Sequence, residues 1–293
     1  MRHFRTLAAA TTILAAAGLA ACDGPKPASS TSNAAASSAA SVPMVSVADA
    51  MSQTTKATSQ YTSVKLKLSE KVNAQGQDVD VTGSGTVSWQ PVAMDMTMTV
   101  PGLSAEFGGD GSIRTLMSGT TMYMNMGDAA AAKSGGKHWM KLDLTSLGTA
   151  GQALADQMNS SSGNDPATQL KLFTSSPDIK RVGQESVNGV QSTHYTGTVD
   201  LTKLAAQQDA SLKSLLTQST KLGLSSMNLD LWVTDKGLPV RIHESTPATA
   251  TTKFDVTVDY SDYSTTPVTV TAPPANDTND LGAMLKGMPG TPK

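Results

Sequence analysis

Apolar and polar residues alternate along much of the chain between residues 64 and 260. In the stretch VKLKLS, Val64, Leu66 and Leu68 fall on one side of an extended backbone, and Lys65 and Lys67 fall on the other. Alternation with a period of two predicts antiparallel strands that have one apolar face and one face in water. The same pattern recurs in VDVTGSGTVSW (79–89), MDMTMTV (94–100), TMYMNM (121–126), HWMKLDL (138–144), LDLWVTD (229–235), LPVRIHES (238–245) and FDVTVDY (254–260).

Two local signals refine this sheet. The segment 182–200 contains Asn188-Gly189 between two extended runs, which predicts a β-hairpin with a two-residue turn. Gly83 and Gly85 lie on the apolar side of the strand expected at 79–89, where a glycine pair indicates a bend or a bulge in a curved sheet.

Three segments follow helical spacing instead. Residues 200–219 begin with Asp200 as a helix cap, and a short helix over 165–173 would carry Pro166 in its first turn. Residues 145–159 place four apolar side chains on one side, Leu147, Ala150, Leu154 and Met158. The pattern as a whole predicts an α+β fold, in which one long twisted antiparallel sheet has its apolar face partly covered by a few helices.

The first residues have the layout of a secretory signal peptide. A basic start with Arg2, His3 and Arg5 precedes an Ala/Leu-rich run over residues 6–21, which is too short for a membrane span. The run closes on Leu-Ala-Ala-Cys, and this tetrapeptide resembles a bacterial lipobox, in which the thiol receives a diacylglycerol before the chain is cut. We therefore expect residues 1–21 to be a lipoprotein leader and Cys22 to be the acylated residue.

Cys22 is the only cysteine among 293 residues. An ordinary signal peptide followed by an incidental cysteine is the alternative. An exported chain with one thiol has no partner for an internal disulfide, which favours acylation as the use of that thiol. Two acyl chains hold a protein stably on a bilayer without spanning it.

Composition divides the rest of the chain. Residues 22–44 are the acylated cysteine and an Ala/Ser/Pro-rich tether with nothing to build a core, and 45–272 form the folded domain. Residues 273–293 are rich in Pro, Gly, Asn and Asp, and we expect a mostly disordered tail, with a docked turn as the alternative. Without the leader the chain has 20 basic and 24 acidic residues, so it lacks the excess of positive charge that is typical of nucleic-acid-binding proteins.

The sequence contains few residue patterns that are typical of catalytic sites. The mature chain contains His138, His194 and His243 at wide spacing, with no H-x-x-x-H pair and no further cysteine as a metal ligand. It also has no G-x-S-x-G elbow and no phosphate-binding loop. The two later histidines are expected to be surface groups with hydrogen-bond partners on strand faces. We expect a protein that is not an enzyme and that uses no metal or cofactor.

Three stretches carry a family resemblance. They are GQESVNGVQSTHYTGTVDLTKL, LDLWVTDKGLPVRIHES and VTVDYSDYSTTPVTVTAPP, in this order. The chain resembles the LppX/LprA/LprF/LprG lipoproteins of mycobacteria and their actinobacterial relatives over residues 45–273. The resemblance implies a LolA/LolB-like fold, in which a half-barrel sheet wraps around helices. It also implies a hydrophobic cavity that holds the acyl chains of lipids or lipoglycans.

Methionines suggest where such a cavity would lie. Eight of the 15 methionines fall between Met94 and Met140, mostly at alternate positions of expected strands. Methionine is flexible and polarizable, and can line a pocket that adapts to different acyl chains, although it also substitutes for leucine in an ordinary core. The candidate lining residues are Met94, Met96, Met98, Val100, Met122, Met124, Met126, Met140, Leu142, Leu154 and Met158.

Three functions remain open from the sequence. The first is a lipid-anchored carrier at the outer face of the cytoplasmic membrane, which takes up an amphiphile by its acyl chains and passes it to a membrane transporter or another component. Its moving part would be the glycine-containing linker over residues 145–164. The second is a non-catalytic sensor or interaction module that partners a membrane signalling or cell-envelope protein, and the third is a structural lipoprotein of the cell wall.

Overall fold

The computed structural model describes residues 46–74, 77–107, 109–125, 127–148, 151, 170, 173–174, 176, 178–204, 224–250 and 253–286. These residues form one sheet of 12 strands with short helices. The strands are β1 (Ser63–Ala74), β2 (Gln77–Trp89), β3 (Val92–Thr99), β4 (Ser112–Ser118), β5 (Thr121–Asn125), β6 (Trp139–Asp143), β7 (Lys180–Val187), β8 (Val190–Asp200), β9 (Ser226–Val233), β10 (Pro239–Ser245), β11 (Lys253–Ser264) and β12 (Thr278–Asp280). The helical elements are α1 (Val47–Thr58), α2 (Pro101–Phe107), α3 (Asp128–Lys133), η1 (Leu144–Leu147), α6 (Leu201–Leu204), η2 (Ala275–Asp277) and α8 (Leu281–Lys286).

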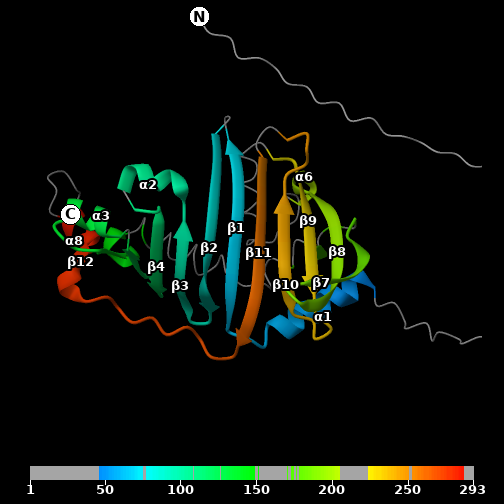
Figure 1. Cartoon of the computed structure of the whole chain (residues 1–293). Helices are drawn as coiled ribbons and strands as arrows, with labels where there is room; N and C mark the ends of the chain where they lie inside the picture. Colours follow the sequence, from blue (N-terminus) through cyan, green and yellow to red (C-terminus); the bar gives the residue numbers. More distant parts are fainter. Residues whose placement is uncertain are drawn as a thin grey trace, which may run out of the picture. The chain divides into compact units, whose positions relative to one another are not determined.

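The sheet consists of two antiparallel meanders that meet at its centre (Figure 1). Strands β1 to β6 follow one another toward one border, and β7 to β11 run from the opposite border back to the middle. There β11 pairs with β1, and Leu66 lies opposite Tyr260. The chain must therefore pass from one border region to the other between β6 and β7. The α+β class with one large sheet is confirmed, and every strand pair is antiparallel except β6 with β12.

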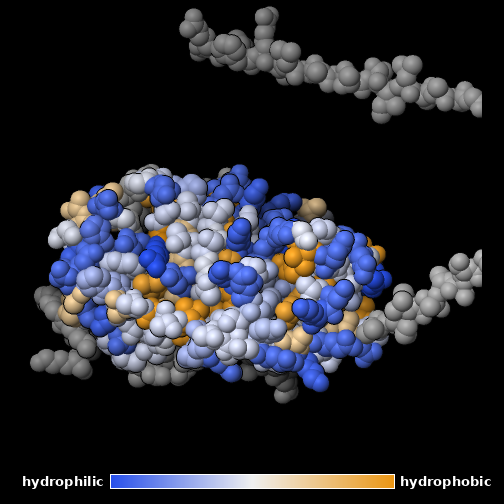
Figure 2. Space-filling model, turned by 60° about the horizontal axis from the view of Figure 1, so that its bottom comes forward, coloured by the Kyte–Doolittle hydropathy of each residue, from blue (hydrophilic) through white to orange (hydrophobic). Residues whose placement is uncertain are grey.

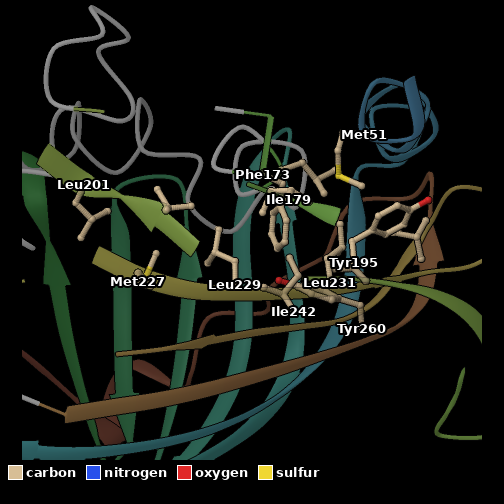
Figure 3. Packing of buried hydrophobic residues seen from close by; sticks show 14 of the residues in the cluster. Met51, Phe173, Ile179, Tyr195, Leu201, Met227, Leu229, Leu231, Ile242 and Tyr260 are labelled. Atoms are coloured by element: carbon tan, nitrogen blue, oxygen red, sulfur yellow. The ribbon is translucent and has the colours of Figure 1, made fainter. Parts of the chain in front are cut away.

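The sheet has an inner face, which we define by the buried residues of β8–β11 and β1. Leu229 and Leu231 of β9 and Val64 of β1 are fully buried there. Met51 of α1 and Phe173 pack on the same side, and Figure 3 shows them above the strands, with the strand side chains directed toward them. The opposite side of the sheet is the outer face. Most of its strand positions are polar, as the alternation predicts, but Leu116 of β4 and Trp139 of β6 are buried on this side.

Helix α1 and strand β4 are elements that the periodicity did not predict. Ser46 caps α1 by accepting a hydrogen bond from the backbone N–H of Asp49 at 3.1 Å. The buried side of α1 begins with Val47, Ala50 and Met51, but it continues with Thr54 and Thr58, so its apolar stripe is short. Each threonine hydroxyl donates to the carbonyl four residues earlier, at 2.9 Å for Thr54 and 2.8 Å for Thr58, which lets these side chains be buried.

The C-terminal segment is a correction to the sequence prediction. Residues 273–293 were expected to be mostly disordered, but 275–286 form η2, β12 and α8. Strand β12 pairs in parallel with β6, and Asn279 lies opposite Met140. The Asp280 carboxylate lies 3.2 Å from Lys141 Nζ, and Asp277 accepts from the backbone N–H of His138 at 3.0 Å. These contacts with a distant part of the chain hold a segment that has little local propensity for structure.

The glycine pair in β2 marks a close approach and no bulge. The register of β2 with both neighbours is continuous through Gly83 and Gly85. A Cβ on Gly85 would lie 2.1 Å from the carbonyl oxygen of Asp95 and 2.7 Å from Cα of Met96. The absence of a side chain therefore lets β3 curl tightly against β2.

Two predicted local signals are confirmed. Asn188 and Gly189, with φ of 52° and 82°, form the turn between β7 and β8. The Asp200 carboxylate accepts hydrogen bonds from the backbone N–H of Thr202 at 3.0 Å and of Lys203 at 3.1 Å, and so caps α6. The rest of the helices predicted over 145–159, 165–173 and 200–219 lies outside the described residues, apart from η1 and the buried Leu170 and Phe173.

In the view of Figure 2, hydrophilic residues predominate and apolar residues form small groups among them. Within the described part of the chain, no helix combines the length and the apolar character that a membrane span requires.

Candidate functional site

The methionines of the first meander form rows across the inner face. Continuous registers place Met94 of β3 opposite Val87 of β2, and Val87 is buried among the residues of the inner face. From Met94 the row continues through Met117 of β4 and Met122 of β5 to Leu142 of β6. A second row contains Gly85, Met96, Thr115, Met124 and Met140. A third row begins with Gly83, Met98 and Ile113.

The structure therefore brings most of the predicted lining residues onto one surface, which we call the methionine wall. The predicted residues in it are Met94, Met96, Met98, Met122, Met124, Met140 and Leu142. Val100 follows the end of β3, where its backbone N–H donates to the carbonyl of Gly111 at 3.0 Å. Met126, Leu154 and Met158 lie outside the described residues. A role of the wall in binding stays a prediction.

Met117 is a wall residue that the sequence analysis missed. It lies between Met94 and Met122 and is 4% exposed. The alternation in β4 is broken twice, because the polar Thr115 lies on the inner side between Ile113 and Met117, and the buried Leu116 lies on the outer side. This short strand therefore has no clear period-two signal in the sequence.

The inner face differs between the two meanders. In β8–β10 it is filled, and the side chains of Val199, Leu229 and Leu231 are completely buried. Most residues of the methionine wall are only half-buried, including Met122 and Met124. Apolar side chains that keep access to solvent in a curved sheet are the surface on which an apolar ligand can displace water.

A small pocket adjoins the far end of this wall. It has a volume of about 140 Å³ and is lined by Met140 together with Ala130 and Ala131 of α3. Lys137 and His138 also contribute to its lining. The pocket shows that α3 leaves space beside the wall, although this volume holds only a few methylene groups.

Two carboxyl groups also lie on the inner face. Glu244 follows Ile242 by two residues in β10, and Glu70 follows Leu68 by two residues in β1, so each points to the apolar side. Both lie opposite Val256 of β11, one from each side. Burial raises the pKa of Glu244 above its usual value. Both glutamates break the apolar alternation of their strands, and this was the sequence signal that could have revealed them.

The outer face carries a network of hydrogen bonds around Asp230. Its carboxylate lies 2.9 Å from Nε2 of His194 and 3.3 Å from Nδ1 of His243. Burial opposes the charge of Asp230, but hydrogen bonds with His243, Thr196 and His194 outweigh it and lower its pKa to about 2. The hydrogen bond to Asp230, followed by the one to Asp255, raises the pKa of His243.

Aromatic stacking extends this network. The His194 ring lies 4.2 Å from the Trp232 ring, centroid to centroid, with 10° between the planes. Trp232 Nε1 donates to Glu185 at 2.9 Å, and Nδ1 of His194 lies 3.0 Å from the same carboxylate. The Trp232 hydrogen bond, followed by that of His194, lowers the pKa of Glu185. The two later histidines thus have partners on the outer face, as predicted, and no described group of three His, Cys, Asp or Glu residues has a metal-binding arrangement.

Comparison with known proteins places the chain in a family. No family model matches it. It is 36% identical over 237 residues to an uncharacterized 31.2 kDa protein of Streptomyces griseus from the rplA–rplJ intergenic region, and the alignment covers 76% of each chain. The chain belongs to this family. A second member, the putative lipoprotein SCO4650 of Streptomyces coelicolor, is 30% identical over 255 residues, which are 81% of this chain and 76% of that protein.

Among solved structures, the chain is similar to lipoprotein LppX of Mycobacterium tuberculosis. That match covers 77% of this chain and 98% of LppX, with 17% identity and a TM-score of 0.46. The predicted resemblance to actinobacterial lipoproteins is confirmed by SCO4650, which has the name of a putative lipoprotein.

Proposed function

We propose that this protein is a membrane-anchored lipoprotein that binds the acyl chains of a lipid or lipoglycan on the methionine wall. It carries this ligand at the outer face of the cytoplasmic membrane and passes it to another membrane component. The diacylglyceryl group on Cys22 is the anchor, and residues 22–44 are a flexible tether that lets the folded domain reorient. The role is binding and transfer without a chemical step.

The half-buried methionine wall is the observation that carries this proposal. A side chain that served only the core would be buried as completely as Leu229 or Leu231. Met122 and Met124 share their face with those leucines and still keep access to solvent. Each methylene group that moves from water onto such a surface contributes about 0.8 kcal/mol, so about ten methylenes of an acyl chain suffice for tight binding.

The anchor has separate support. The leader, the Leu-Ala-Ala-Cys ending and the single cysteine agree with each other, and the relative SCO4650 has the name of a putative lipoprotein. Methionine suits a carrier because its flexible, polarizable side chain adapts to chains of different shape and forms no directional bond that would delay release.

Native mass spectrometry tests the proposal. The protein would be secreted from a Streptomyces host with Cys22→Ala and a cleavable leader, purified without detergent, and then extracted with solvent. We expect a bound amphiphile with two or three acyl chains at a ratio near one per protein. A ligand-free mass, together with no uptake of added lipids, would contradict the carrier function and favour an interaction module for a membrane signalling or envelope protein.

A further inference from the structure

The inner face of the sheet carries charge at only two described positions of strands β1–β6 and β8–β11. These are Glu70 and Glu244, and the other inner positions of these strands are uncharged: they are apolar side chains, glycine or threonine, with Gln77 and Gln191 near strand ends. Arg181, on the border strand β7, is opposite Tyr195 and is three strands from Glu244. Both charged positions therefore have the same sign, and no described cation lies next to them on this face.

The two carboxyl groups share one row across the sheet. Registers place Glu244 and Glu70 on either side of Val256, so their Cα atoms are two strand spacings apart, about 10 Å. Glutamate side chains are long enough to converge over the smaller Val256. One small group above Val256 can therefore contact both carboxyls.

Along β1, this row lies between fully buried positions and the exposed end of the strand at the β1–β2 turn. Val64 of β1 and Tyr260 of β11 are buried, at 0% and 6% exposure, whereas Val79 near the β1–β2 turn is 42% exposed. Glu70 lies between Val64 and the turn. An amphiphile with its acyl chains on the apolar wall would have its headgroup near this row.

Among the described residues, neither carboxyl forms a hydrogen bond or an ion pair. Glu244 is surrounded closely enough that burial raises its pKa, and it is still half-buried, so its side chain borders accessible space. A carboxylate in such a place is unfavourable until a cation or a hydrogen-bond donor pairs with it.

We propose that Glu70 and Glu244 form the headgroup site of this carrier and that they select lipids with a primary ammonium group. The ammonium nitrogen supplies three donors and the opposite charge, which matches two carboxylates that converge on one point. Headgroups with net negative charge would be repelled, and quaternary headgroups would offer charge without a donor. This inference rests on the proposed function, because it assigns the polar end of the same ligand.

Photolabelling with matched lipids tests the selection. The intact lipoprotein would be placed in vesicles that contain phosphatidylethanolamine, phosphatidylcholine or phosphatidylglycerol with the same diazirine-bearing acyl chains. Labelled peptides from the inner face would then be quantified by mass spectrometry. We expect the ethanolamine lipid to label these peptides about tenfold more than the choline lipid, as a charge-assisted hydrogen bond would produce, and the glycerol lipid to label them least.

Three variants make the test specific. Glu244→Gln and Glu70→Gln should each reduce the preference to about twofold or less, with labelling by the choline lipid unchanged. Asp80→Asn removes a similar charge from an exposed outer position of β2 and should leave the preference as it is. Thermal melting of each variant would confirm that it is folded.

The outcomes separate the two proposals. No labelling of inner-face peptides by any lipid would overturn the carrier function, and this inference with it. Labelling that is equal for the three headgroups, or a preference that both glutamine variants retain, would overturn the headgroup site alone and leave the carrier function in place.

Discussion

Gly85 of β2 lies directly opposite Met96 of β3, and the two backbones approach so closely that no side chain fits at residue 85. A Cβ at residue 85 would lie 2.1 Å from the carbonyl oxygen of Asp95 and 2.7 Å from Cα of Met96, and both are backbone atoms that cannot rotate away. Gly83, two residues earlier, has its nearest obstacle at Cγ of Met98, at 3.2 Å, which is part of a flexible side chain.

This difference predicts unequal effects of two similar substitutions. Gly85→Ala should lower the free energy of unfolding by about 3 kcal/mol, because β3 must move away from β2. Gly83→Ala should cost about 1 kcal/mol or less, because Met98 can change rotamer. Urea unfolding followed by tryptophan fluorescence measures both. Equal effects of the two substitutions would contradict the close approach at Gly85.

The Asp230 network predicts a dependence of stability on pH. Its partners lower the pKa of Asp230 to about 2, so its stabilising contribution is complete above the ordinary value of 3.8 and is lost as the pH falls toward 2. The pKa of His243 is raised above 6.5, so its contribution is complete below pH 6.5 and is lost as the pH rises through the raised value. Both contributions are complete together between about pH 4 and 6.5.

Two variants separate these contributions. His243→Gln should remove the loss of stability above pH 6.5, and Asp230→Asn should reduce the loss between pH 4 and 2. The shifted pKa of Asp230 should contribute about 2 kcal/mol to the free energy of unfolding, and about 1 kcal/mol of this should be lost between pH 5 and pH 3, which unfolding curves at these two pH values can resolve. A His243→Gln protein whose stability still declined above pH 6.5, as in the original protein, would assign the decline to other groups.

The methionine wall predicts a loss of binding without a loss of fold. Met124→Gln keeps the length of the side chain and places an amide on the half-buried wall, where it can still reach water. Retained lipid should fall about fivefold while the free energy of unfolding changes by about 1 kcal/mol or less. Thr97→Gln, at an exposed outer position of β3, is the control and should retain lipid. If Met124→Gln kept its lipid, the wall would not be the binding surface.

The proposed acylation of Cys22 predicts how the protein is attached to the membrane. Cys22→Ala should abolish incorporation of labelled palmitate, because the proposed anchor is a diacylglyceryl group on this thiol. The precursor should also accumulate with its leader, since cleavage follows acylation. A gel reports both effects: the label on the band shows palmitate incorporation, and its mass relative to the mature protein shows whether the leader remains. Labelled palmitate on the variant would place the lipid elsewhere in the chain.

Strands with one apolar and one polar face could be predicted from the sequence because their alternation is long. Val64, Leu66 and Leu68 repeat it in β1, and Leu229 and Leu231 repeat it in β9. Helix α1 escaped because its buried side contains Thr54 and Thr58, whose polarity is satisfied within the helix. Its apolar pattern, Val47, Ala50 and Met51, covers only the first turns and is too short to indicate a helix by itself.

The C-terminal elements could not be predicted from the sequence for a different reason. Strand β12 has three residues, and its place beside β6 depends on contacts of Asp277 and Asp280 with residues about 140 positions earlier. Side-chain contacts over such separations leave no local signal. The same holds for Glu70 and Glu244, because strand parity shows their face, whereas only the register shows that both flank Val256.

The pairing of β1 with β11 has a consequence for how the exported chain matures. Ser63 lies opposite Ser264 at the end of this pair, so the centre of the sheet joins residues that are about 200 positions apart. Translocation delivers the N-terminal residues first, so the strands of the first meander emerge with their apolar side uncovered well before their central partner is available. Pairs with such long sequence separation form slowly. During this interval the unpaired strands are open to aggregation, so we expect the nascent chain to need an extracytoplasmic chaperone.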